Sequence, residues 1–370
     1  MRLAVVGAGP IGLEAALLGA ERGHEVTVLE AGEVGHGLRA WGPTRAFSPL
    51  SMNLSPRLLA HIGPHDPAAL LTGPELAMLL ERAAVGLDVR REMRVLGISR
   101  ARMSRRDFAD HPVRGDRAFR LLVERCGEES IIEADCVLDA SGLAGGALPL
   151  GSGLGERALV GDPRLVRTLG DLHAALPSLD GARVALVGHG HSAAHAIGLL
   201  IDSGARVTWL VRAAHRRPVT EVADDPLPAR AEVVLRANDL AAAPPANLVV
   251  ERRAHVERVS AAPLALTLSN GTRVEVDTIV GLTGDRPDTS MLRELAVDLA
   301  PATEGTRGLW RAISSVTSCL SVPLVRAEEL ESGEPGFFVV GRKSYGRAST
   351  FLLQNGLRQL EQIFERLPQA

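Results

Sequence analysis

Two glycine-rich turns, each between an apolar run and a stretch of helical character, constrain the fold of this 370-residue chain more than any other feature. The first reads Gly-Ala-Gly-Pro-Ile-Gly over residues 7–12, and the second reads Gly-His-Gly-His-Ser-Ala over residues 188–193. A strand, a glycine turn and a helix in this order form the phosphate-binding part of a dinucleotide site. We therefore expect two such units, and two nucleotides held by one chain.

The first unit carries each part of the motif. Residues 2–6 predict a buried parallel strand, and residues 10–22 predict a helix whose N-terminal N–H groups favour phosphates. The first glycine permits the tight turn, the second lets a pyrophosphate approach the backbone, and the third allows the helix to pack closely on the strand. A second strand over residues 25–29 ends at Glu30, which can accept hydrogen bonds from a ribose diol. The predicted phosphate-binding residues of this unit are Gly7, Gly9, Pro10, Ile11 and Gly12.

The second unit differs from the first at the end of its second strand. Residues 183–187 and 206–211 predict the two strands, and the second strand ends at Arg212 instead of an acid. An arginine can pair with the 2′-phosphate of NADPH, whereas an acid would repel it, so we expect NADPH rather than NADH. The alternative is a solvated arginine at the end of a strand. The predicted nucleotide-binding residues of this unit are Gly188, Gly190, His191, Ser192, Ala193, Arg212 and Arg217.

Histidines and cysteines raise the question of a metal or a disulfide. His191 and His195 are four residues apart, which can place two ligands on one helical face. No carboxylate or thiolate accompanies them, so we predict a phosphate-lining role and no metal site. The three cysteines, Cys126, Cys136 and Cys319, form no C-x-x-C pair. This spacing fits a reducing compartment and provides neither a disulfide framework nor a thiolate zinc site.

Charge and hydropathy exclude some classes of partner. The formal net charge is -3, so no overall basic field favours nucleic acid. The apolar run at residues 3–6 leads directly into the first glycine turn and is far too short to span a bilayer. We therefore expect a cytoplasmic protein that binds neither nucleic acid nor membrane, acts on a small-molecule substrate and can form a homodimer.

The two turns and three later segments together resemble flavoproteins with two dinucleotide-binding domains, a superfamily that includes thioredoxin-reductase-like enzymes and flavin-containing monooxygenases. The later segments are Val-Leu-Asp-Ala-Ser-Gly at residues 137–142, Gly-Leu-Thr-Gly-Asp-Arg-Pro at residues 281–287 and Phe-Phe-Val-Val-Gly at residues 337–341. The resemblance implies that the unit ending in Glu30 binds the ADP half of FAD and that the other unit binds the nicotinamide nucleotide. The glycine-rich strand ends that it places against the cofactors contain Ala140, Gly142, Gly284 and Gly341.

The resemblance also implies the fold class and the domain order. The expected fold is α/β, with two Rossmann-like three-layer domains, the second inserted in the first. The FAD-binding domain would comprise residues 1–155 and 280–370, and the NADPH-binding domain residues 156–279. Residues 88–135, which are rich in arginine, predict a hairpin or meander that covers the FAD sheet. These arginines could hold an anionic partner, although a solvated hairpin is the more common outcome.

The loop over residues 35–49 is expected beside the flavin. It holds two aromatic residues and two arginines in a glycine-rich stretch. In monooxygenase-like members of the superfamily, a Gly-Gly-x-Trp segment followed by an arginine lies beside the flavin, and this loop is similar. Trp41 and Phe47 would wall the flavin pocket or belong to the core. Arg39 or Arg45 would stabilise negative charge on reduced flavin or on phosphate.

The turn after the last strand is the other part of the expected active site. A helix follows, which Ser349 or Thr350 can cap, and in the superfamily the N-terminus of this helix points at the flavin pyrimidine ring. The helix dipole would favour negative charge on reduced flavin. Arg342 stands where the superfamily has an aspartate, so we expect the usual ribityl contact to differ. The residues of this segment expected at the rim of the active site or against the cofactor are Lys343, Tyr345 and Phe351.

These features predict hydride transfer from NADPH to FAD. The redox cysteine pair that the disulfide reductases of the superfamily need is missing. We therefore predict a monooxygenase that uses reduced flavin and O2 to oxidise a small nucleophilic substrate. The alternative is a cysteine-independent reductase that passes electrons to a small molecule or a protein, and the third hypothesis is a flavin-based redox sensor. The candidate catalytic residues are Trp41, Arg45, Lys343 and Tyr345.

Overall fold

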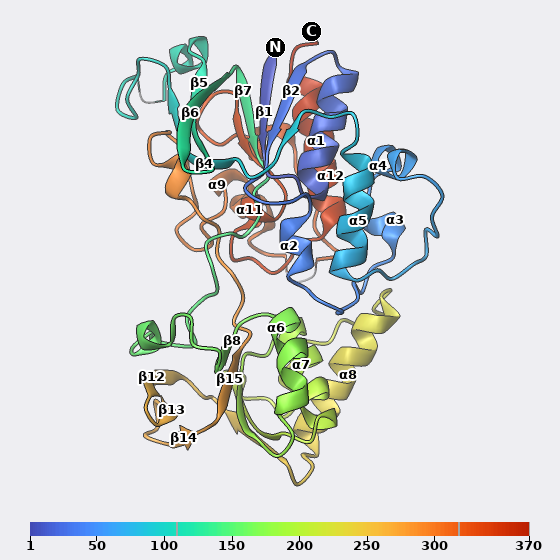
Figure 1. Ribbon diagram of the computed structural model, residues 1–370, viewed down its shortest axis with the longest axis vertical. Helices are drawn as coiled ribbons and strands as arrows, with labels where there is room; N and C mark the ends of the chain where they lie inside the picture. Colours follow the sequence, from blue (N-terminus) through green and yellow to red (C-terminus); the bar gives the residue numbers. More distant parts are fainter. Residues whose placement is uncertain (109, 317–318, 370) are drawn as a thin grey trace. The chain divides into compact units, whose positions relative to one another are not determined.

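The computed structural model describes residues 1–108, 110–316 and 319–369. It divides the chain into two compact units (Figure 1). The first unit consists of Met1–Arg39, Ser48–Gly146 and Asp285–Ala370. The second unit consists of Ala40–Phe47 and Ala147–Gly284. The chain passes between the units mainly at residues 146/147 and 284/285, whereas the expected domain boundaries are 155/156 and 279/280. Residues 40–47 also belong to the second unit, and no sequence pattern indicates this.

The first unit is built on a parallel sheet. Its described strands are β1 (Arg2–Val6), β2 (Glu25–Leu29), β3 (Val89–Arg90), β7 (Cys136–Asp139) and β16 (Phe337–Val339). They follow the order β16-β7-β1-β2-β3, and every neighbouring pair is parallel. Val6 pairs with Leu29 on one side and with Asp139 on the other. The carboxyl ends of these strands therefore meet at one edge of the sheet, which is where α/β sheets bind ligands.

Alternating side chains of β1 contribute to two separate cores. Leu3 and Val5 pack with the helices on one face, whereas Ala4 and Val6 pack with an antiparallel sheet on the other (Figure 1). A strand buried on both faces needs this continuous apolar run. The helices of the unit are α1 (Pro10–Glu21), α2 (His36–Arg39), α3 (Leu50–Asn53), α4 (Pro56–His61), α5 (Gly73–Ala83), α9 (Arg307–Ile313), α10 (Ala327–Leu330), α11 (Arg342–Tyr345) and α12 (Leu353–Arg366). The antiparallel strands are β4 (Arg94–Arg100), β5 (Phe119–Arg125) and β6 (Glu128–Ala134), which confirms the predicted meander.

The second unit has the same three layers. Val184 and Leu186 of its central strand pack toward helices, and Ala185 and Val187 pack toward an antiparallel sheet. The described parallel strands, in the order β11-β10-β9-β15-β8, are β8 (Leu165–Val166), β9 (Arg183–Val187), β10 (Arg206–Val211), β11 (Leu248–Arg252) and β15 (Thr278–Gly281). The helices are α6 (Leu169–Ala175), α7 (His191–Asp202) and α8 (Pro228–Ala242), and the antiparallel strands are β12 (Val256–Ala261), β13 (Leu264–Leu268) and β14 (Arg273–Glu275). Both units are thus Rossmann-like three-layer α/β domains, as predicted.

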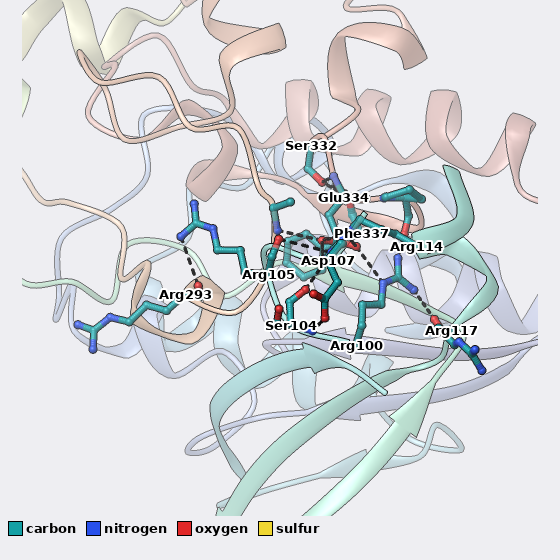
Figure 2. Close-up of polar contacts among 12 residues, drawn as sticks. Arg100, Ser104, Arg105, Asp107, Arg114, Arg117, Arg293, Ser332, Glu334 and Phe337 are labelled. Atoms are coloured by element: carbon teal, nitrogen blue, oxygen red, sulfur yellow. Dashed lines mark hydrogen bonds and ion pairs between the residues drawn. The ribbon is translucent and has the colours of Figure 1, made fainter. Parts of the chain in front are cut away.

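A buried ion cluster ties the antiparallel sheet of the first unit to the segment that leads into β16 (Figure 2). Glu334 accepts a hydrogen bond from Arg100 Nε at 2.9 Å and one from Arg114 Nη2 at 2.8 Å, and all three side chains are buried. The backbone N–H of Ala296 donates a further bond of 2.9 Å to Glu334. Burial acts to raise the pKa of Glu334, but the hydrogen bonds from Arg114, Ala296 and Arg100 hold it below its ordinary value.

Within the described residues, no helix has both the length and the apolar character needed to cross a membrane.

Candidate active site

The first glycine turn excludes a side chain at two of its three glycines. Gly7 has φ +99, and a Cβ placed on it would lie 2.8 Å from the carbonyl oxygen of Ala140. A Cβ on Gly12 would collide with the carbonyl oxygen of Gly7. Gly7 and Gly12 therefore serve the tight turn and the helix–strand contact that the sequence predicts.

Gly9 is different, because the space beside it is open. It is the N-cap of α1, with φ −81, and a Cβ added to it would meet no atom within 4 Å. Pro10 opens the helix, and no side chain caps it, so its first N–H groups remain available. Gly142, in the turn after β7, likewise has open space beside it. A free helix N-terminus beside an uncrowded glycine is what a dinucleotide pyrophosphate requires, so these residues fit FAD.

Glu30 follows β2 and is buried against the same turn. Its Oε2 accepts a hydrogen bond from the backbone N–H of Ala8 at 2.7 Å, and its Oε1 accepts one from the backbone N–H of Gly32 at 2.9 Å. A carboxylate has about four lone-pair positions, so each oxygen retains capacity for a ribose hydroxyl. The two backbone bonds fix the carboxylate next to the turn that would hold the phosphates.

The last strand and the C-terminal helix converge on the first turn. A Cβ on Gly341, which has φ +65, would lie 3.0 Å from Cγ1 of Ile11, and a Cβ on Gly356 would lie 2.7 Å from Cδ1 of Ile11. The Ile11 side chain therefore packs between the end of β16 and α12. Its backbone N–H, in the first turn of α1, is the part that can bind phosphate.

Lys343 and Tyr345 are buried rather than exposed, and their expected place at the rim of the active site stays a prediction. Residues 303–306 cover the short helix that carries them, because the backbone N–H of Thr306 donates to the carbonyl oxygen of Ser344 at 3.0 Å. Burial raises the pKa of Tyr345 to about 12, so its phenol stays protonated at neutral pH. A buried, protonated phenol supports packing rather than proton transfer with solvent.

Phe351 packs against Tyr345 with ring centroids 5.2 Å apart. Arg342 donates from Nη1 to the carbonyl oxygens of Gly346 at 2.8 Å and Ala348 at 2.7 Å, which fixes the loop before α12. Leu352, which has an extended backbone, is the N-cap of α12, and no side chain caps this helix. The prediction that Ser349 or Thr350 caps this helix is therefore wrong.

The arginine at the end of α2 is engaged within the first unit. Arg39 Nη2 lies 3.3 Å from Oε1 of Glu81, on α5. This ion pair is partly exposed, and it attaches the short helix to its neighbour. A role for Arg39 toward phosphate or flavin stays a prediction.

The aromatic residues of the loop lie in the second unit. Trp41 is 40% exposed, which excludes the alternative that it belongs to the core. Phe47 contacts His191 edge-on, with ring centroids 6.3 Å apart, and so lies beside the second glycine turn. Arg45 belongs to the same segment, and the expected place of Trp41 and Arg45 beside the flavin stays a prediction.

The second glycine turn repeats the geometry of the first. Gly188 has φ +127, and a Cβ on it would collide with the carbonyl oxygen of Leu282. Gly190 is the N-cap of α7, with φ −83, and has open space beside it. Ser192 lies in the first turn of α7, and Ala193 is fully buried where a small residue is needed. This turn therefore offers a second free helix N-terminus for phosphates.

Sequence reasoning missed Trp209 as a part of this site. Its buried indole Nε1 on β10 donates a hydrogen bond of 2.7 Å to the carbonyl oxygen of Gly188. A tryptophan within a buried apolar strand needs an acceptor for its N–H, and that requirement was the available signal.

Gly284, which the sequence predicts at a cofactor, is the last residue of the second unit and has φ +89. Its carbonyl oxygen accepts a hydrogen bond from the backbone N–H of Leu148 at 2.7 Å.

Two arginines predicted to bind the nicotinamide nucleotide have different surroundings. Arg212 is exposed at the end of β10 and forms no hydrogen bond or ion pair with any residue in the described part of the chain. Burial and the charge of Arg212 both lower the pKa of His189. Arg217 instead forms ion pairs of 2.7 Å with Glu221 and Asp239. The side chain that remains available for an additional phosphate is therefore Arg212.

The histidines of this region form no metal centre in the ranges that the structure describes. The rings of His173 and His195 lie 6.3 Å apart, and burial lowers the pKa of both. Burial also lowers the pKa of His191. These imidazoles are therefore favoured in the neutral form at neutral pH.

All three cysteines lie in the described ranges, and none forms a disulfide. Cys136 begins β7 and is buried, and burial raises the pKa of its thiol to about 12. A thiol that stays protonated is a poor nucleophile. Cys126 is exposed between β5 and β6, and Cys319 is partly exposed.

Comparisons with known proteins agree with this arrangement. The family model "pyridine nucleotide-disulphide oxidoreductase" matches residues 70–305, and a second model of the same description matches residues 2–34. No curated protein sequence matches the chain. The bacillithiol disulfide reductase Bdr of Bacillus cereus is 18% identical, with a TM-score of 0.71, and the match covers 99% of this chain and 98% of that one.

Two further solved structures share the fold. A flavin monooxygenase from Stenotrophomonas maltophilia is 20% identical, with a TM-score of 0.62 and coverage of 98% of this chain and 97% of that one. An engineered water-forming NADPH oxidase, made from the NADH oxidase of Lactobacillus brevis, is 19% identical, with a TM-score of 0.55. The match covers 99% of this chain and 69% of that one.

The matched models span most of the chain, and both glycine turns have the geometry of dinucleotide sites. The cofactors are accordingly FAD and a nicotinamide dinucleotide. The chain belongs to the pyridine nucleotide-disulphide oxidoreductase family, and it is an FAD-dependent oxidoreductase.

Proposed function

We propose that the protein is an NADPH-dependent flavin monooxygenase, in which reduced flavin reacts directly with O2 and a small nucleophilic substrate. The observation that carries this proposal is that the cysteines form no redox-active pair. No two of the three form a disulfide, and the thiol of Cys136 is buried and protonated. Without a redox pair of thiols, electrons that enter the flavin leave it without a thiol relay.

The residues of the first unit would bind and orient FAD. The N–H groups at the start of α1 and the open space at Gly9 would receive the pyrophosphate, and Glu30 would accept hydrogen bonds from the ribose. Bound FAD supplies the two-electron chemistry that takes a hydride from NADPH and, with O2 and one proton, transfers one oxygen atom to the substrate and leaves the other as water.

The preference for NADPH rests on Arg212. A planar guanidinium can hold a 2′-phosphate in a bidentate manner, and this one has no other partner in the described ranges. The engineered NADPH oxidase carries a glycine-to-alanine substitution, an aspartate-to-alanine substitution 18 residues later and an alanine-to-arginine substitution 19 residues later. In the present chain, the residues at the same spacing are Ala193, Val211 and Arg212.

Two observations support oxygen as the acceptor. The Stenotrophomonas flavin monooxygenase shares the fold over nearly its whole length, so a chain of this size accommodates such an enzyme. Trp41 is exposed in a glycine-rich loop that also contains Arg45, and it offers a large aromatic surface to a ligand. These residues are the ones we propose at the substrate side of the flavin.

Rapid mixing tests the proposal. The purified holoprotein is reduced with NADPH without oxygen, mixed with oxygenated buffer and followed by flavin absorbance. The proposal predicts a transient species between reduced and oxidised flavin, and less hydrogen peroxide per NADPH when an oxidisable sulfide or amine is added. Reoxidation without a transient, with fast transfer to quinones or dyes, would instead identify a reductase. Failure of NADPH to reduce the flavin would favour a redox sensor.

A further inference from the structure

A buried lysine–aspartate pair lies at the carboxyl edge of the parallel sheet in the first unit. Lys343, the only lysine of the chain, is 1% exposed, and Asp139, the last residue of β7, is fully buried. Lys343 Nζ lies 2.6 Å from Asp139 Oδ2 and donates a hydrogen bond of 3.0 Å to Ser141 Oγ. Ser141 Oγ in turn donates to Asp139 Oδ1 at 2.6 Å. The three side chains form a closed polar ring.

The turn that carries Asp139 and Ser141 packs directly against the first glycine turn. The backbone N–H of Ala140 donates to the carbonyl oxygen of Val6 at 2.9 Å, and the carbonyl oxygen of Ala140 occupies the space that a Cβ on Gly7 would need. The backbone N–H of Ser141 donates to Asp139 Oδ1 at 3.2 Å, which fixes the turn after β7. A displacement of the Asp139 side chain would therefore move the backbone that packs on Gly7.

The pair also determines the charge at this edge. An unpaired Asp139 carboxylate would be buried close to the turn that must receive a dianionic pyrophosphate, and both the burial and the repulsion would be unfavourable. Lys343 neutralises this carboxylate inside the protein. Lys343 also acts on Asp288: burial acts to raise the pKa of Asp288, but its hydrogen bonds to Ser290 and the charge of Lys343 hold this pKa below its ordinary value.

We propose that Lys343 is a positioning residue of the FAD site. Its ammonium neutralises Asp139 and, through Ser141, holds the turn of residues 139–142 against Gly7. Lys343 does not itself need to contact the cofactor. The proposal rests on FAD binding by the first unit and is independent of the molecule that finally accepts the electrons.

The test compares Lys343→Met with the double variant Asp139→Asn/Lys343→Met. FAD is removed, the dissociation constant for added FAD is measured by fluorescence over a range of pH, and thermal unfolding of the FAD-free proteins is recorded. Lys343→Met should weaken FAD binding about tenfold at neutral pH, and the affinity should recover as the pH falls because protonation removes the unpaired charge. The double variant, which is neutral at this position, should bind FAD nearly as tightly as the wild type at every pH.

Two results would overturn the proposal. One is a Lys343→Met protein that unfolds at a lower temperature but binds FAD as the wild type does, which would indicate a purely structural role. The other is a folded double variant whose affinity for FAD stays low at all pH values. This result would contradict the proposal even if Lys343→Met alone does not fold. A wild-type protein that does not bind FAD would contradict the FAD site itself, which is a separate failure.

Discussion

Trp209 Nε1 donates a hydrogen bond of 2.7 Å to the carbonyl oxygen of Gly188, so a buried strand residue braces the turn of the second nucleotide unit. Trp209→Phe keeps an aromatic ring in the core but removes the donor. We expect the free energy of unfolding to fall by about 1 kcal/mol and the dissociation constant for NADPH to rise several-fold. Chemical denaturation and nucleotide titration measure the two effects. Trp310→Phe, on α9 in the first unit, is the control, and an equal loss of NADPH affinity in both variants would refute the role of Trp209.

The uncrowded glycines at the two helix N-termini allow a paired test. Gly9 and Gly190 have φ −81 and −83, which any residue can adopt, and a Cβ at either position meets no protein atom within 4 Å. Alanine should therefore leave the FAD-free protein as stable as the wild type, or slightly more stable. Gly9→Ala should reduce the FAD content of the purified protein and leave NADPH affinity intact, and Gly190→Ala should have the reverse effect. Normal binding of both nucleotides by both variants would show that the pyrophosphates lie elsewhere.

Arg212 is the available cation at the end of β10. Arg212→Gln should raise the KM for NADPH about tenfold or more while leaving the KM for NADH nearly unchanged, because only NADPH has the additional phosphate. Arg206→Gln, an exposed arginine at the start of the same strand, is the matched control. Steady-state flavin reduction with each nucleotide gives the ratio. An unchanged ratio in Arg212→Gln would contradict the assignment.

Glu334 carries the only carboxylate among the three side chains of the buried ion cluster in Figure 2. Glu334→Gln should lower the free energy of unfolding by about 3–5 kcal/mol, because it leaves Arg100 and Arg114 buried without an anion. The pKa of Glu334 is lower in the folded protein than its ordinary value of 4.5, so its contribution is complete above that pH and is lost as the pH falls below it. Urea denaturation at several pH values should therefore show the two proteins converging in acid. A constant difference down to low pH would contradict this explanation.

Local sequence was sufficient to predict the two nucleotide-binding units, whereas the fold class and the domain order followed from the family resemblance. The strand, glycine turn, helix and terminal residue of each unit are neighbours in the chain, and their spacing follows from backbone geometry. The strands over residues 2–6, 25–29, 183–187 and 206–211 were all confirmed. The hairpin or meander expected over residues 88–135 was also confirmed, and the apolar segments at residues 119–123 and 131–132 of this charged stretch indicated it.

The parts of the site that were not predicted depend on contacts between distant segments. Lys343 and Ser141 are separated by 202 positions, and Arg100 and Glu334 by 234, so no local pattern links their side chains. Lys343 is buried against Asp139 and Ser141, and sequence spacing does not reveal this contact. The predicted helix cap failed because α12 begins after Leu352, beyond the loop that Arg342 holds through the carbonyl oxygens of Gly346 and Ala348.

The central claim, that the flavin passes electrons on without a thiol relay, is tested most directly by a protein without cysteine. The variant Cys126→Ser/Cys136→Ala/Cys319→Ser removes every thiol in the chain. The measurement is the rate of NADPH consumption with oxygen, and with a small acceptor, relative to the wild type at equal flavin content. We predict that both rates remain within about twofold of the wild type, since Cys136 is buried and protonated and no disulfide is formed. Loss of acceptor turnover while NADPH still reduces the flavin would contradict the claim.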